Sequence, residues 1–123
     1  MSIITAYNGA WKAGDVETLA EILHDEFVFN SHVGCLGKSD VLAYVGGDNG
    51  QTSENDRILF ENDQVGVAHS IVHFANGSTS EAVLIFLQFK DGKIILMETG
   101  AIPLSDDYHL VGIYVFFDYS PTE

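Results

Sequence analysis

Residues 83–97 read VLIFLQFKDGKIILM, two strongly apolar runs joined by the pair Asp91-Gly92. Branched and aromatic side chains favour β-strands, and Asp-Gly is a preferred pair for a two-residue hairpin turn. The stretch therefore predicts two antiparallel strands that are neighbours in a sheet.

Two further turn signals, Asn62-Asp63 and Asn76-Gly77, lie at strand-length intervals before this hairpin. Both are typical of tight turns between strands. The second half of the chain is therefore expected to form four strands in succession. We place them at Arg57 to Glu61, Val65 to Phe74, Ser80 to Lys90 and Lys93 to Ile102. The apolar segment from Tyr108 to Tyr119 suits a further strand or a dimer arm.

Helices are expected in the first half of the chain. Large apolar side chains fall at helical spacing from Ile4 through Tyr7 to Trp11, and Gly14 supplies a C-terminal stop. Asp15 can cap a second helix. The inner stripe of that helix is expected to contain Val16, Leu19, Ala20 and Leu23.

A short strand and a third helix are expected to follow. Phe27 and Phe29 alternate with polar or smaller residues from Glu26 to Ser31, which predicts a strand with its Phe face inward. Ser39 is a candidate cap for the third helix. That helix is expected to end at Gly46 and Gly47 and to be followed by a polar loop, Asp48 to Asn55.

The order of these elements, helices first and strands last, favours an α+β fold. We expect the helices to pack on the concave face of a curved antiparallel sheet. The length of 123 residues fits a single domain, residues 1–123. Residues 103–123 are then a C-terminal extension.

Charge and composition exclude several classes of partner. Eighteen acidic residues against five Lys or Arg give a formal net charge of −13, and the cations do not cluster, which disfavours nucleic acid and anionic membranes. No run approaches the ~20 apolar residues of a membrane span, and residues 1–11 lack the pattern of a secretory signal. With the single Cys35, these features lead us to expect a cytoplasmic protein.

Three blocks of sequence resemble the nuclear transport factor 2-like superfamily, especially its SnoaL-like polyketide cyclase and ketosteroid isomerase-like branches. The blocks are YNGAWKAGD at residues 7–15, FVFN at 27–30 with GKS at 37–39, and FLQFKDGKI at 86–94. The resemblance implies a cone-shaped α+β barrel with a deep pocket between the sheet and the helices. It does not fix the function, because this fold carries both enzymes and binding modules.

The resemblance also implies roles for individual positions. Tyr7 falls where ketosteroid isomerases keep the tyrosine that donates to a developing oxyanion, but Ser31 and Ile85 fall where those enzymes keep their two carboxyl groups. A steroid-type mechanism is therefore not expected. Thr99 falls where SnoaL-like cyclases keep an acidic base. Glu98 is its neighbour and faces the opposite side unless a bulge intervenes.

His69 and His73 are the candidate bases. They share one face of the expected third strand with Val67 and Ile71, and we predict that this face is turned inward. A neutral imidazole in an apolar pocket can act as general acid or base. With Tyr7 it would form a donor and base pair. A structural hydrogen-bonding role for either histidine stays open.

A largely apolar pocket wall is expected around these candidates. The same aromatic residues could equally be hydrophobic core, and both interpretations can hold in a cone open at one end. The expected ligand-binding residues are Trp11, Phe27, Phe29, Ser31, Ile71, Ile85, Met97 and Thr99. The ligand would be a small apolar or aromatic organic molecule.

No metal or cofactor is expected. His69 and His73 are about 13 Å apart along a strand, too far to ligate one ion together. His32 and Cys35 are close in sequence, but no further ligand accompanies them. The glycines do not form a phosphate-binding pattern.

The sequence thus leaves two functions open. The first is a small-molecule-binding SnoaL-like protein that could be a cofactor-free lyase or isomerase with His69 or His73 as base and Tyr7 as donor. The alternative is a noncatalytic binding or dimerisation module. Because Leu84 and Phe86 leave the outer face of their strand apolar, a homodimer through the sheet is expected, unless the C-terminal segment covers that face.

Overall fold

The computed structural model describes residues 2–31, 34–47, 50–74 and 79–104, which form three helices and six strands. In chain order the elements are α1 (Ile3–Ala13), α2 (Val16–Ile22), β1 (Leu23–Ser31), β2 (Gly34–Gly37), α3 (Lys38–Gly46), β3 (Thr52–Glu61), β4 (Val65–His73), β5 (Glu81–Lys90) and β6 (Lys93–Pro103). The strand predicted at residues 57–61 begins earlier, at Thr52, inside the segment expected to be a polar loop. Residues 34–37 were also expected to be a loop and form β2 instead.

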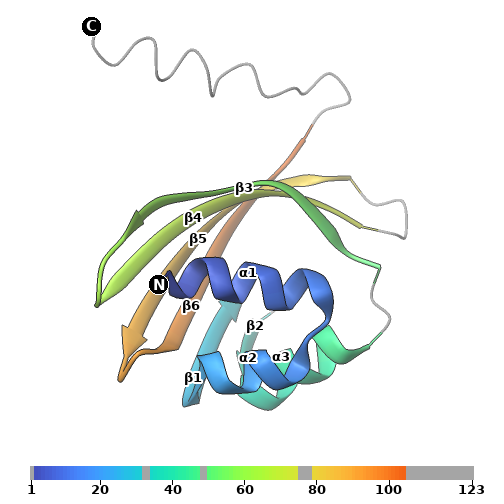
Figure 1. The fold of residues 1–123 in the computed structure, drawn as a ribbon. Coiled ribbons are helices and arrows are strands. Elements are labelled where there is room, and N and C mark those ends of the chain that lie inside the picture. Colours follow the sequence, from blue (N-terminus) through green and yellow to red (C-terminus); the bar gives the residue numbers. More distant parts are fainter. Residues whose placement is uncertain (1, 32–33, 48–49, 75–78, 105–123) are drawn as a thin grey trace, which may run out of the picture.

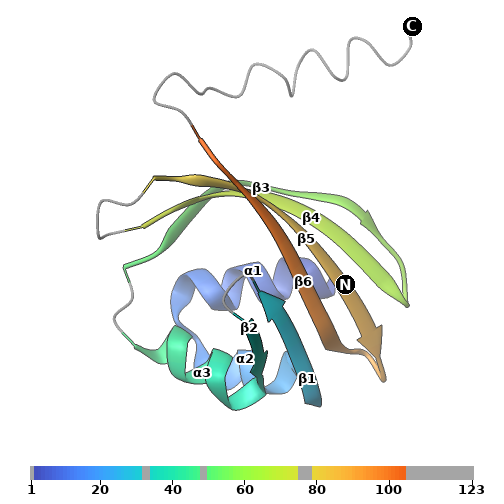
Figure 2. The same cartoon turned by 180° about the vertical axis from the view of Figure 1, so that it is seen from behind.

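The six strands form one sheet in the order β2-β1-β6-β5-β4-β3. The sheet arches over α1 and remains open, with the three helices on its concave side (Figure 1). Figure 2 shows the sheet from the opposite side, on which none of the described helices lies. The predicted α+β fold is confirmed, with one difference. The β1–β6 pair is parallel, whereas every other pair among the described strands is antiparallel.

The helix boundaries follow the capping signals closely. Gly14 ends α1 in the left-handed conformation, with φ 67°, and Asp15 accepts a hydrogen bond of 3.1 Å from the Thr18 amide at the start of α2. Ser39 is not the cap of α3: the helix begins at Lys38, and the Asp40 carboxylate accepts from the Gly37 amide at 2.9 Å. None of these helices is long and apolar enough to cross a membrane, within the residues described.

The predicted hairpin turns are confirmed where the structure describes them. Asp91 and Gly92 both adopt positive φ, 56° and 76°, as a tight two-residue hairpin requires. At the β3–β4 turn, Asn62 Oδ1 accepts from the amides of Gln64 and Val65, each at 2.8 Å. The pair Asn76-Gly77 and the segment Tyr108 to Tyr119 lie outside the described residues.

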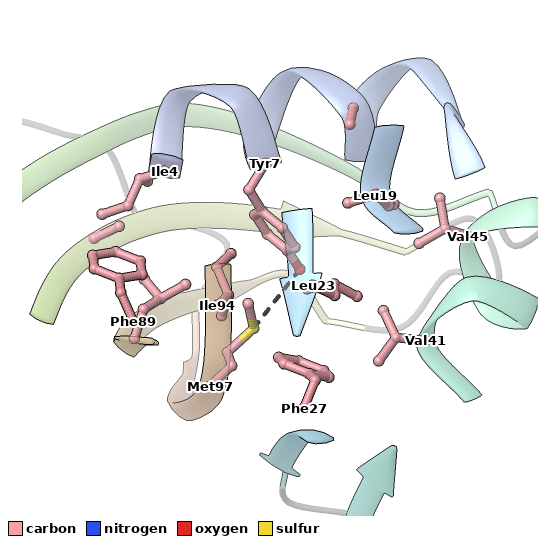
Figure 3. Close-up of a cluster of buried hydrophobic side chains, with 13 residues drawn as sticks. Ile4, Tyr7, Leu19, Leu23, Phe27, Val41, Val45, Phe89, Ile94 and Met97 are labelled. Atoms are coloured by element: carbon pink, nitrogen blue, oxygen red, sulfur yellow. Dashed lines mark hydrogen bonds between the residues drawn. The ribbon is translucent and has the colours of Figure 1, made fainter. Parts of the chain in front are cut away.

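The hydrophobic core lies between the helices and the concave face of the sheet (Figure 3). Its most buried members are Ile4, Leu19, Leu23, Leu87 and Ile94. Packing at the Ile4 end of α1 is close. A Cβ atom on Gly66 of β4 would lie 2.6 Å from Ile4 Cδ1, so a larger residue here would have to displace the buried Ile4 side chain.

Candidate functional site

A cavity of about 380 Å³ lies between the concave face of the sheet and helices α1 and α3. Its volume is at the lower end of the range for small-molecule sites, roughly 300–1,000 Å³. All six strands contribute to its lining, which is mostly apolar. The predicted pocket is therefore present as a space, next to the packed core.

Three aromatic rings form one wall of the cavity. The ring centroids of Tyr7 and Trp11 on α1 are 5.8 Å apart, and those of Trp11 and Tyr44 on α3 are also 5.8 Å apart. We call these three residues the aromatic wall. Helical spacing places Tyr7 and Trp11 on the same face of α1, one turn apart. The aromatic wall offers a ligand a large, stiff apolar surface.

The Tyr7 hydroxyl is a neutral hydrogen-bond donor inside this wall. Burial raises the pKa of Tyr7 well above its usual range. Its hydroxyl donates to the Met97 thioether sulfur at 3.7 Å, the one acceptor found for it among the described residues (Figure 3). A thioether is a weak acceptor. A ligand oxygen would therefore be a better partner for this hydroxyl than the sulfur is.

A carboxylate that sequence reasoning missed, Asp56, also lines the cavity. In the β3–β4 register, Glu54 pairs with Ile71 and Arg57 pairs with His69, so two β3 residues, Asn55 and Asp56, oppose one residue of β4. Asn55 has a φ of 55° at this β-bulge. Regular alternation from Glu54, which lies on the convex face, would place Asp56 on that face too. The extra residue turns Asp56 to the concave face instead and returns Arg57 to the convex one.

The Asp56 carboxylate is surrounded by donors. It forms an ion pair with Lys12 and a 3.4 Å hydrogen bond with the Ser53 hydroxyl, and Ser70 also donates to it. Burial alone would raise the pKa of Asp56, but the hydrogen bonds from Lys12 and Ser70 and the Lys12 charge outweigh it and hold the pKa below its usual range. Asp56 is therefore a negative charge in the cavity at neutral pH.

The prediction that His69 and His73 face the helices is wrong. On β4 the residues that face the helices and the cavity are Ala68, Ser70 and Val72. Strand alternation then places His69, Ile71 and His73 on the convex face. His73 hydrogen-bonds Ser80 through Nδ1, at 2.6 Å, and Glu54 through Nε2. The pKa of His69 is lowered by burial and by the neighbouring Arg57.

Most of the other predicted pocket residues do line the cavity. They are Tyr7, Trp11, Phe29, Ser31, Ile85, Met97 and Thr99. Phe27 does not line it and is packed in the core, with 2% of its surface exposed. Ile71 lies on the convex face. Glu98 also lies there, as strand alternation predicted, and accepts a 2.8 Å hydrogen bond from the side-chain amide of Asn30.

No site for a metal ion was found in the part of the chain that the structure describes, where no three His, Cys, Asp or Glu side chains come together. Cys35 on β2 is exposed and forms no disulfide. His32 lies outside the described residues. The charged groups that line the cavity are instead Lys12, Asp56 and Glu81.

Comparison with known proteins places these features in a family context. The family model for the SnoaL-like domain matches residues 4–97. No curated protein sequence matches the chain.

Several solved structures have the same fold. An NTF2-like protein of unknown function from Cytophaga hutchinsonii has a TM-score of 0.70 at 15% identity, over 82% of this chain and 88% of that one. A proposed ketosteroid isomerase from Kribbella flavida has a TM-score of 0.68 at 14% identity, over 87% and 80%. An M. tuberculosis LEH-like epoxide hydrolase has a TM-score of 0.64 at 16% identity, over 81% and 80%. At these identities the likeness concerns the fold alone.

Proposed function

Because the chain belongs to the SnoaL-like domain family, we propose that it binds one small, largely apolar organic molecule in the cavity between the sheet and α1. The observation that carries the proposal is the aromatic wall beside about 380 Å³ of space. A core that served stability alone would be expected to fill such a volume, since protein interiors are close-packed. The few polar groups that line it would orient the ligand.

A pair of variants on adjacent residues of β5 tests this proposal. Val83 lines the cavity, and Leu84 lies on the convex face with 50% of its surface exposed. Trp11, the single tryptophan, lines the cavity and reports occupancy by its fluorescence. With 3-phenylpropan-1-ol as the probe, Val83→Phe is expected to weaken binding at least about tenfold by filling the space.

The matched control is Leu84→Phe, which adds a ring of the same size to the same strand but outside the cavity. Its affinity for the probe is expected to stay within about twofold of the parent. Equal weakening by both variants would contradict binding in the cavity. So would unchanged binding in Val83→Phe.

Proton transfer in the same cavity is a second candidate, favoured by the presence of both Tyr7 and Asp56 in its lining. A cofactor-free lyase or isomerase would then use Asp56, in place of an imidazole, to accept a proton while Tyr7 donates to the developing oxyanion. The lowered pKa of Asp56 makes it a weak base, which is why binding is the leading proposal.

Deuterium exchange distinguishes catalysis from binding. If Asp56 acts as a base, the protein will accelerate exchange of the α-protons of 4-phenylbutan-2-one in D₂O, followed by NMR. Asp56→Asn would then lose the acceleration, whereas Tyr7→Phe would reduce it. No acceleration by the parent protein would leave the binding proposal standing and reject proton transfer.

Self-association through the convex face is a further proposal, with a second copy of this chain as the partner. Phe60, Leu84 and Ile102 are 52%, 50% and 68% exposed, although large apolar side chains favour burial. Arg57 Nε on the same face is buried without a hydrogen-bond partner among the described residues. A two-fold interface would cover these apolar groups on both copies.

A further inference from the structure

We infer that the ligand is a cationic amine, an ammonium group on an apolar or aromatic body, and that its charged nitrogen binds between Asp56 and the aromatic wall. The inference rests on the proposed binding function and names the chemical class that this cavity selects. Four observations support it: the position of Asp56, the exposure of Lys12, the charges that line the cavity, and the aromatic rings beside them.

Asp56 is a fixed negative group. Its side chain is only 13% exposed, and the bulge in β3 holds its backbone. Ser53 and Ser70, both on strands, donate to it and orient it. Hydroxyl donors satisfy the oxygens of a carboxylate but leave its full charge in place. The carboxylate therefore needs a cation beside it.

Lys12 supplies that cation at present, but from a position where it can leave. It lies in the last turn of α1, and its side chain is 51% exposed. A half-exposed lysine regains rotamer freedom and hydration when it moves into water, and the incoming ammonium would keep the Asp56 carboxylate paired with a cation. A ligand ammonium could thus replace Lys12 beside Asp56 at small electrostatic cost, while the ligand's apolar body adds burial.

The sum of charges in the lining favours a cation over an anion. Two carboxylates, Asp56 and Glu81, line the cavity against one ammonium, Lys12. Arg57, the next residue after Asp56, is on the opposite face of the sheet. The formal net charge of −13 adds a long-range field that concentrates cations and repels anions.

The aromatic wall supplies a second attraction for the same group. Trp11 is adjacent to Lys12 in α1, and its ring lies 5.8 Å from both Tyr7 and Tyr44. The faces of Trp and Tyr rings attract organic cations, most strongly when water is excluded. An ammonium ion would satisfy Asp56 and the rings together. A neutral alcohol would make the hydrogen bond but gain less from the rings.

Three probes with one apolar body test the charge preference: 3-phenylpropylamine, 3-phenylpropan-1-ol and 3-phenylpropanoate. Each is titrated into the full chain at about pH 7.5, where the amine is a cation and the acid an anion, and Trp11 fluorescence is followed. We expect the amine to bind at least about tenfold more tightly than the alcohol, and the acid to bind most weakly.

Asp56→Asn is expected to bring the amine and the alcohol to within about twofold of each other. Its matched control is Glu21→Gln, which removes one charge from the exposed residue Glu21 of α2, outside the cavity lining. This control should keep the full preference for the amine. If Glu21→Gln loses the preference as Asp56→Asn does, the overall charge is responsible and the inference is overturned.

Lys12→Met provides an independent test, which holds even if Asp56→Asn does not fold well: the direction in which the affinity for the amine changes. It keeps a long apolar stem and removes the internal cation, so the amine should bind severalfold more tightly. The inference is overturned if Lys12→Met binds the amine more weakly than the parent does. It is also overturned if the parent binds the alcohol or the acid as tightly as the amine. Either result leaves the proposal of binding in the cavity intact. Failure of all three probes to bind overturns both.

Discussion

The two faces of β4 differ more in side-chain size than in polarity. The concave face carries Gly66, Ala68, Ser70 and Val72, and the convex face carries Val67, His69, Ile71 and His73. Every concave residue is smaller than its convex neighbours or no larger. The concave side of a curved sheet has less room, and here it must also accept α1 and leave a cavity. On β4, therefore, the smaller side chains are the ones turned toward the helices.

Among the substitutions that test this difference between the two faces, Gly66→Val is expected to have the largest effect, a loss of stability. A Cβ there would lie 2.6 Å from Ile4 Cδ1 and 3.1 Å from Phe89 Cζ, so Gly66→Val must displace these two buried side chains. We expect a loss of about 3 kcal/mol in the free energy of unfolding, measured by urea denaturation.

The control is Gly100→Val on β6, where nothing lies within 4 Å of an added Cβ. Gly100 pairs with Leu84 and so belongs to the convex face. This variant should change stability by no more than about 0.5 kcal/mol, since valine suits a strand. A similar loss in both variants would mean that steric room does not distinguish the two faces.

The convex face gives the next largest effect, through association. If two copies pair through it, Leu84→Lys places a charge in an apolar interface and should convert the dimer to a monomer at micromolar concentration. Light scattering measures the mass directly. Glu17→Lys, at an exposed residue of α2, makes a larger change in net charge and should leave the dimer intact. A parent protein that is already a monomer would reject the proposed dimer.

Much of the fold could be predicted from the sequence, because local signals set it. Gly14 and Asp15 marked the first two helices, and Asp91-Gly92 marked the last hairpin, each through backbone conformation or capping. The strand β2 carried no such signal: its four residues, GCLG, contain two glycines and acquire strand structure only by pairing with β1. Non-local pairing of this kind is not visible in local propensity.

The site was harder to predict, because it depends on which face is concave. Tyr7 and Thr99, the positions that the resemblance singled out, both line the cavity, and so does Met97. The histidines were expected on the inward face from the alignment of the strand by its turns, although the small residues Gly66 and Ala68 indicate that the other face is the crowded one. Asp56 follows a segment expected to be a polar loop, and its place in the cavity depends on the β3–β4 register.

A smaller effect is expected at His73, which lies on the convex face and hydrogen-bonds Ser80 and Glu54. His73→Ala removes the hydrogen bonds to Ser80 and Glu54, which should cost about 1 kcal/mol of stability. The affinity for 3-phenylpropylamine, measured by Trp11 fluorescence, should not change by more than about twofold. A large loss of affinity with stability preserved would show that the convex face takes part in binding after all.

The smallest expected effect is a difference in pH dependence between the two faces. Burial and Arg57 lower the pKa of His69 below its ordinary value of 6.5, so the unfolded chain binds the proton more tightly than the folded one does. Stability from this group is then present above about pH 6.5 and is lost as the pH falls. Asp56, on the concave side, also has a lowered pKa, but its ordinary value is 3.8, so its contribution is lost only in more acid solution.

His69→Gln separates the two contributions. Between about pH 7.5 and pH 5 the variant should lose less stability than the parent, because it has no imidazole to protonate at this position. Below about pH 4 the two proteins should fall in parallel, because Asp56 is present in both. Because His69 is only partly buried, the difference will be a small shift in melting temperature, seen most clearly by scanning both proteins in the same buffers. Identical curves between pH 7.5 and pH 5 would mean that the convex face is as well hydrated as open solvent around this imidazole.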